Sequence, residues 1–145
     1  MYILQEIEDE GQYLKLIEME KKDRDYFKES QIQNMIVEWL ESQGIDFHPS
    51  FSGIKATFGQ RRFMKSQGMK AGHPDLTVEH KNNKHEVLFL EIKTVKGVLS
   101  REQEHWIKKK IEDGYAVSVG WGYYDCIYKI FKYMNNEPVY YEKKN

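Results

Sequence analysis

The sequence has little of several features that would restrict its fold or location. Cysteine occurs once, at Cys126, which excludes an intrachain disulfide and a zinc site built from several thiolates of one chain. No apolar run approaches the roughly 20 residues that a membrane helix needs. Residues 1–11 lack a basic stretch followed by an apolar one, so we expect no signal peptide and a cytoplasmic protein. Without repeats, low-complexity tracts or a Pro/Ser-rich linker, the 145 residues predict one domain.

An excess of positive charge is also missing, because the formal net charge is −1. Nucleic-acid-binding proteins are often strongly basic, so the total charge argues against such a partner. The distribution of charge is more informative: residues 6–10 are acidic, whereas residues 47–74 contain no acid. This segment predicts either a local cationic face for DNA or an exposed polar loop. Its candidate DNA-binding residues are Lys55, Arg61, Arg62, Lys65 and Lys70.

The spacing of apolar residues predicts a mixed α/β fold. Helical spacing appears over 26–43, 100–113 and 124–134. Short apolar runs predict strands at 45–51, 76–78, 87–92 and 115–119, and residues 52–73 are predicted to form a long loop. The order helix, three strands, helix, strand, helix is typical of a central sheet flanked by helices. Residues 1–25 give no clear pattern, so we expect an N-terminal extension there and the domain at 26–145.

Three polar residues next to the predicted hairpin point to chemistry. If the strands pair so that residue numbers sum to 166, Asp75 faces Glu91, and Lys93 shares that face. Two facing carboxylates repel each other unless a cation neutralises them, and Mg²⁺ prefers such oxygen ligands. This set matches phosphodiester cleavage, in which a metal activates water and a lysine offsets the growing negative charge. The alternative is an ordinary exposed strand end with Lys93 paired to an acid.

Four motifs then carry a family resemblance: Glu29-Ser-Gln-Ile-Gln33, Gly72-His-Pro-Asp75, Leu90-Glu-Ile-Lys93 and Gly97-Val-Leu-Ser-Arg-Glu-Gln103. Over roughly residues 26–134 the chain resembles the VRR-Nuc family of virus-type replication and repair nucleases, within the PD-(D/E)XK superfamily. The resemblance implies a single-domain, restriction-endonuclease-like αβββαβ core with a mixed sheet. It also implies a requirement for Mg²⁺, with Mn²⁺ able to substitute, and DNA as the substrate.

The resemblance also suggests roles for further residues. Glu29 is expected to be a catalytic carboxylate and metal ligand, although a charge that favours the helix dipole is the alternative. The main-chain carbonyl of Ile92 is an expected metal ligand. Gln103 either reaches the active site or merely completes a capping box with Ser100. Lys96 and Arg101 are expected to contact phosphates, unless they lie on a solvated face.

Several functions remain open at this point. Stand-alone viral and bacterial members of the family resemble homodimers that act on four-way junctions, whereas fused domains resemble monomers that act on flaps. The chain is closer to the first group, so a Holliday-junction-resolvase-like enzyme of a bacterium or phage, acting in replication, repair or recombination, is expected. Alternatives are a flap or other branched-DNA nuclease, a DNA-binding module without turnover, and a protein-interaction domain.

Overall fold

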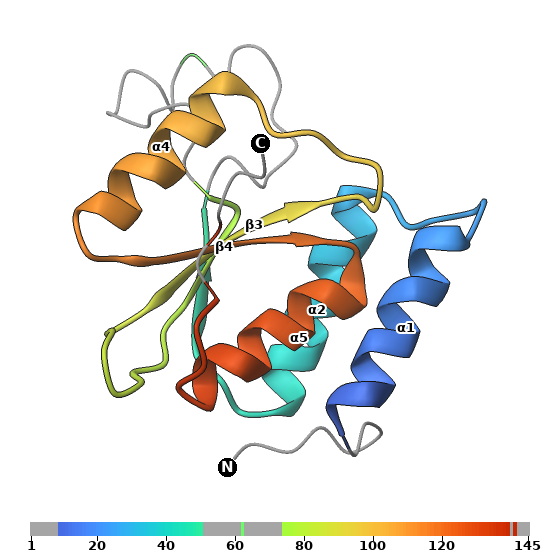
Figure 1. Ribbon diagram of the computed structural model, residues 1–145, viewed down its shortest axis with the longest axis horizontal. Helices are drawn as coiled ribbons and strands as arrows, with labels where there is room; N and C mark the ends of the chain where they lie inside the picture. The colour runs from blue at the N-terminus through green and yellow to red at the C-terminus, as the bar shows by residue number, and fades with distance from the viewer. Residues whose placement is uncertain (1–8, 51–61, 63–73, 140, 142–145) are drawn as a thin grey trace.

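The computed structural model describes residues 9–50, 62, 74–139 and 141. In this part of the chain, helices cover both faces of a four-stranded mixed sheet (Figure 1). In chain order the elements are α1 (Glu10–Lys22), α2 (Glu29–Ser42), β1 (Phe47–Pro49), β2 (Leu76–Val78), β3 (Leu88–Lys93), α4 (Arg101–Glu112), β4 (Ala116–Trp121) and α5 (Tyr123–Met134). The predicted α/β class is therefore confirmed.

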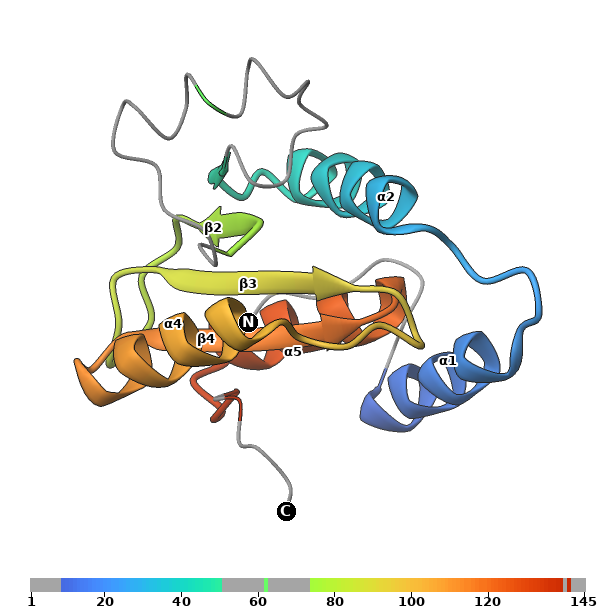
Figure 2. The same cartoon turned by 90° about the horizontal axis from the view of Figure 1, so that it is seen from above.

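The sheet has the strand order β1-β2-β3-β4, and β3 lies between β2 and β4 (Figure 2). β2 pairs with both β1 and β3 in antiparallel fashion, whereas β3 and β4 are parallel and are joined through α4. Leu76 faces Leu90 in the β2–β3 pair, so residue numbers sum to 166, the register predicted from the sequence. This register brings the residues just before β2 next to the end of β3.

The two faces of β3 contribute to two separate apolar layers. Leu88, Leu90 and Ile92 are buried in the main core, which α1, α2 and α5 cover. Phe89 faces the other way and packs in a smaller cluster with Ile107 of α4. This two-sided burial explains why β3 is an almost unbroken apolar run. No helix within the described ranges combines the length and apolarity needed to cross a membrane.

Helix boundaries follow from local caps. α2 begins at Glu29, not at Tyr26, because the Gln31 side chain accepts the main-chain N–H of Lys28 at 2.9 Å and closes the first turn. At the other end, Gly44 has φ +67°, the left-handed conformation that stops a helix. The predicted loop at 52–73 lies outside the described residues, apart from Arg62.

α1 was not predicted. Its N-cap is Asp9, whose carboxylate accepts the N–H of Gln12 at 2.9 Å. Tyr13 and Ile17 are buried in the main core, and the Tyr13 ring stacks in a tilted arrangement on Tyr128 of α5 at 5.1 Å. α1 therefore packs on the domain, while the domain boundary expected at residue 25/26 stays a prediction.

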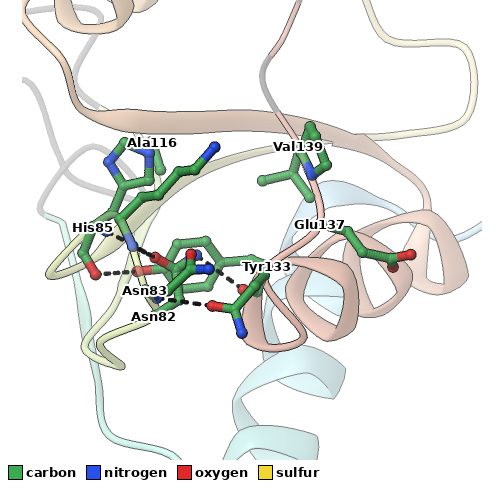
Figure 3. Close-up of a pocket in the computed structure, with 10 residues that line it drawn as sticks. Asn82, Asn83, His85, Ala116, Tyr133, Glu137 and Val139 are labelled. Carbon is green, nitrogen blue, oxygen red and sulfur yellow. Dashed lines mark hydrogen bonds between the residues drawn. The ribbon is translucent and has the colours of Figure 1, made fainter.

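The C-terminal end of α5 is tied to the turn between β2 and β3 (Figure 3). Asn82 donates to the carbonyl of Tyr133 at 3.0 Å, and the Tyr133 hydroxyl donates to the carbonyl of His80 at 2.7 Å. Asn136 accepts the N–H of Asn83 at 2.8 Å. The cavity beside these bonds measures about 20 Å³ and has room for about one water, so it does not serve as a substrate site.

Candidate active site

Asp75 and Glu91 lie side by side where β2 and β3 meet. The β2–β3 register places them opposite each other, close enough for Asp75 to raise the pKa of Glu91. Asp75 Oδ2 accepts the main-chain N–H of Ile92 at 2.8 Å. The Asp75 carboxylate thus accepts a β3 main-chain N–H in the way a main-chain carbonyl of a neighbouring strand would, and this bond fixes the side chain against β3.

Desolvation makes both carboxyl groups weaker acids than usual. Glu91 is only 2% exposed, and desolvation together with the neighbouring Asp75 raises its pKa to about 9. Desolvation also raises the pKa of Asp75, although the Ile92 N–H and the charge of Lys93 oppose the shift. The pairing of a buried and a half-buried carboxyl group therefore favours the protonated form of Glu91 near neutral pH unless a cation takes the place of the proton.

Gln103 fulfils both roles that the sequence left open. Its main-chain N–H donates to Ser100 Oγ at 3.1 Å, and its Oε1 accepts the N–H of Ser100 at 2.8 Å, which completes the capping box of α4. Its Nε2 donates to Glu91 Oε1 at 2.8 Å. The first turn of α4 thereby orients the Glu91 carboxyl group.

Lys93 brings a positive charge to the pair. Its ammonium group lies 4.0 Å from Glu91 Oε1 and 3.7 Å from Glu29 Oε1, and its side chain is only 10% exposed. Glu29 begins α2 and its side chain is 53% exposed, so this ion pair is screened by water. The structure therefore brings together Asp75, Glu91, Lys93, Gln103 and, at the rim, Glu29.

The residues of this site fit a hard divalent cation. Asp75 and Glu91 offer carboxylate oxygens at one point, and their raised pKa values show that charge there needs compensation. Within the described ranges, no three His, Cys, Asp or Glu side chains gather closely enough to bind a metal together. A metal ion would therefore need further ligands such as the Ile92 carbonyl, water or substrate oxygens, as Mg²⁺ commonly does.

The expected DNA-binding residues are only partly described. Arg62, Lys96 and Arg101 are exposed, while Lys55, Arg61, Lys65 and Lys70 lie outside the described residues. Lys96 lies three residues after the end of β3. Its ammonium group lies 5.5 Å from the centre of the Tyr26 ring, a cation–π contact that the sequence did not predict. Arg101 opens α4, two residues before Gln103.

Comparison with known proteins agrees with this architecture. The VRR-NUC domain profile matches residues 10–120, and this family implies a nuclease domain. The chain therefore belongs to the VRR-NUC domain family. It is also similar in fold to a solved structure described as a VRR_NUC domain protein, with a TM-score of 0.63 and 23% identity, covering 81% of this chain and 98% of that one. No curated protein matches the chain.

Proposed function

We propose that this protein is a metal-dependent endodeoxyribonuclease that hydrolyses phosphodiester bonds in branched DNA. The observation that carries the proposal is the pairing of the buried Glu91 with the half-buried Asp75 next to Lys93. A protein gains nothing in stability from placing a second carboxyl group beside a buried one, since the pair favours a protonated form at a pH where free carboxyl groups are ionised. Such an arrangement is typical of a site that is complete only with a cation.

The roles of the residues follow from their positions. Bound Mg²⁺ or Mn²⁺ would neutralise the carboxylates and polarise a phosphate oxygen. Asp75 and Glu91 hold the cation, and the Ile92 carbonyl is a further candidate ligand. Lys93 offsets the negative charge that grows on the phosphate in the transition state. Gln103 keeps the Glu91 carboxylate directed toward the cation by its hydrogen bond.

Glu29, which the resemblance implies is a metal ligand either directly or through water, lies at the rim of the site in this scheme. Its carboxylate pairs with Lys93 at 3.7 Å. We propose that it acts at the rim of the site, either by holding Lys93 or by binding the cation through a water molecule.

The proposed substrate is a four-way DNA junction, cut by a homodimer. A two-fold symmetric dimer presents two equivalent sites to a junction that is itself two-fold symmetric. This part of the proposal rests on the family resemblance of stand-alone members. Flap cleavage by a monomer is the alternative, and light scattering together with cleavage of labelled junctions, flaps and linear duplexes distinguishes the two.

The direct test is cleavage with Mg²⁺ by Asp75→Ala and Glu91→Ala. Each variant should lose cleavage while retaining DNA binding within a few-fold, because it removes a metal ligand and leaves the basic surface intact. Glu86→Ala is a matched control, since Glu86 lies in the same hairpin but is 81% exposed. Turnover near the wild-type rate in either site variant would contradict the assignment. Intact binding by a wild-type protein that cuts no structure in the panel would favour a DNA-binding module.

A further inference from the structure

The N-terminus of α5 is capped by a residue from a distant helix. Gly122 occupies the N-cap position and has no side chain to accept the free N–H groups of the first turn. The carboxylate of Glu20, in the last turn of α1, accepts the N–H of Tyr123 at 2.8 Å and that of Tyr124 at 3.0 Å. Glu20 is 7% exposed, so these two bonds replace its contact with water.

The same turn holds the end of the catalytic strand. The N–H of Gly122 donates to the main-chain carbonyl of Lys93 at 2.8 Å and so extends the β3–β4 pairing by one bond. Gly122 has φ +96°, and a Cβ atom there would lie 2.4 Å from Glu20 Oε2 and 2.8 Å from Val95 Cγ1. The Glu20 carboxylate, the Gly122 turn and the chain just after Lys93 are therefore packed directly against one another.

We infer that Glu20 is a positioning residue of the proposed nuclease site. Glu20 holds the Gly122 turn, the turn holds the end of β3, and the position of Lys93 is fixed in this way. This inference rests on the proposed function. The Lys93 ammonium group lies 3.7 Å and 4.0 Å from two different carboxylates, so its position depends on where its main chain is anchored. A displacement of about 1 Å at a reacting group can lower the rate by about a hundredfold.

The first test concerns the physical link and needs no cleavage. In Glu20→Gln, an amide NH₂ replaces one of the two acceptors and faces a main-chain N–H. We expect the Gly122 amide to exchange with deuterium at least about tenfold faster by NMR, since its turn loses an anchor. Asp9→Ala is the matched control, because it removes the cap at the opposite end of α1. Unchanged exchange in Glu20→Gln, or equal acceleration in Asp9→Ala, overturns the link.

The second test is a double-mutant cycle with Lys93→Ala. Glu20→Gln should lower kcat about tenfold with KM within twofold, and should cause less than about a twofold further loss when Lys93 is already alanine. Equal losses in both backgrounds would show a general structural role and overturn the inference. Glu20→Asp keeps the charge but is one methylene shorter, so we expect an intermediate kcat. It also serves as the second variant if Glu20→Gln is unfolded at the assay temperature.

Failure of the inference and failure of the proposed function give different results. An active wild-type enzyme with an additive Glu20→Gln effect removes the coupling to Lys93 and leaves the nuclease assignment standing. A wild-type protein that cuts no DNA in the presence of Mg²⁺ removes the proposed function, and the positioning role of Glu20 with it, whatever the exchange rate of Gly122.

Discussion

Replacing Glu91 by Gln should stabilise the metal-free protein while abolishing cleavage. The protonated carboxyl group of Glu91 and a glutamine amide have nearly the same shape. The amide oxygen can accept from Gln103 as Glu91 Oε1 does, and the amide nitrogen can donate to Asp75. Glu91→Gln therefore reproduces the neutral state that the folded protein prefers, without the need to take up a proton.

The magnitude follows from the pKa of Glu91, which rises from 4.5 to about 9 on folding. At pH 7.5 the unfolded side chain is ionised, and protonating it over about three pKa units costs about 4 kcal/mol. Part of this cost belongs to the coupled pair with Asp75, so we expect the variant to gain about 1–3 kcal/mol. For a chain of this length that corresponds to a rise in Tm of roughly 3–10 °C.

The pH dependence has a definite sign. Because the folded-state pKa of Glu91 is raised, its contribution to stability is fully present below about pH 4.5 and is lost as the pH rises toward 9. The difference in Tm between Glu91→Gln and wild type, measured in EDTA, should therefore be small near pH 4.5 and grow up to about pH 9. Glu86→Gln removes an exposed charge from the same hairpin and should show no such trend.

Addition of Mg²⁺ should reverse the order at pH 8. The wild-type protein should gain stability by binding the ion, whereas Glu91→Gln should gain much less because it has lost an anionic ligand. A Glu91→Gln variant less stable than wild type in EDTA at pH 8, or a difference that does not change with pH, would refute the reasoning about the buried pair.

Three further predictions concern neighbouring residues. Gln103→Ala should lower stability by about 1 kcal/mol and also slow cleavage, whereas Ser100→Ala should lower stability alone, because only Gln103 contacts Glu91. Thermal melts and turnover of both variants check this, and the same turnover in the two variants would contradict it. Lys93→Ala should reduce kcat more than metal affinity, and Lys93→Arg should not restore full activity, since a planar guanidinium does not replace a compact ammonium; wild-type kcat in Lys93→Ala would leave the lysine as a structural ion-pair partner. Neutralising Arg61 and Arg62 together should weaken binding of all DNA structures alike and reduce the slope of log affinity against log salt by about one to two units; an unchanged slope would place the DNA elsewhere, for example over Lys96 and Arg101.

The hairpin that carries the site could be predicted from sequence because two independent patterns coincide there. Side-chain alternation fixes which residues of β3 share a face, and the short strands leave few registers that bury Leu88, Leu90 and Ile92. The pairing of Asp75 with Glu91 follows from that register. The raised pKa values of the two carboxyl groups do not, because they depend on how deeply the surrounding elements bury these side chains.

The role of Gln103 was only half predictable. Its spacing from Ser100 identifies a capping box from local sequence alone. Its contact with Glu91 depends on how α4 crosses the sheet between β3 and β4, and local sequence contains no information on that angle. The two interpretations are compatible in the structure because different atoms of the amide serve each of them.

α1 was missed because it buries few apolar side chains and one of its buried positions is a glutamate. Tyr13 and Ile17 are its buried apolar residues, and the next buried position on that face is Glu20. A buried glutamate breaks the apolar pattern on which helix prediction relies. Its partners are main-chain N–H groups about 100 residues further along the chain, next to a glycine, so no side chain in the sequence marks their position.

The attachment of α5 to both ends of the hairpin determines where the polypeptide can be truncated without loss of the site. At one end Gly122 bonds to Lys93, and at the other Tyr133 and Asn136 bond to the turn that joins β2 to β3. The family profile stops at residue 120, before any of these bonds. A fragment that ends with the profile would keep every proposed catalytic residue. It would lose the hydrogen bonds that hold the two ends of the hairpin in place. Expression libraries and fusion proteins built on this domain should therefore place the C-terminal boundary beyond Asn136.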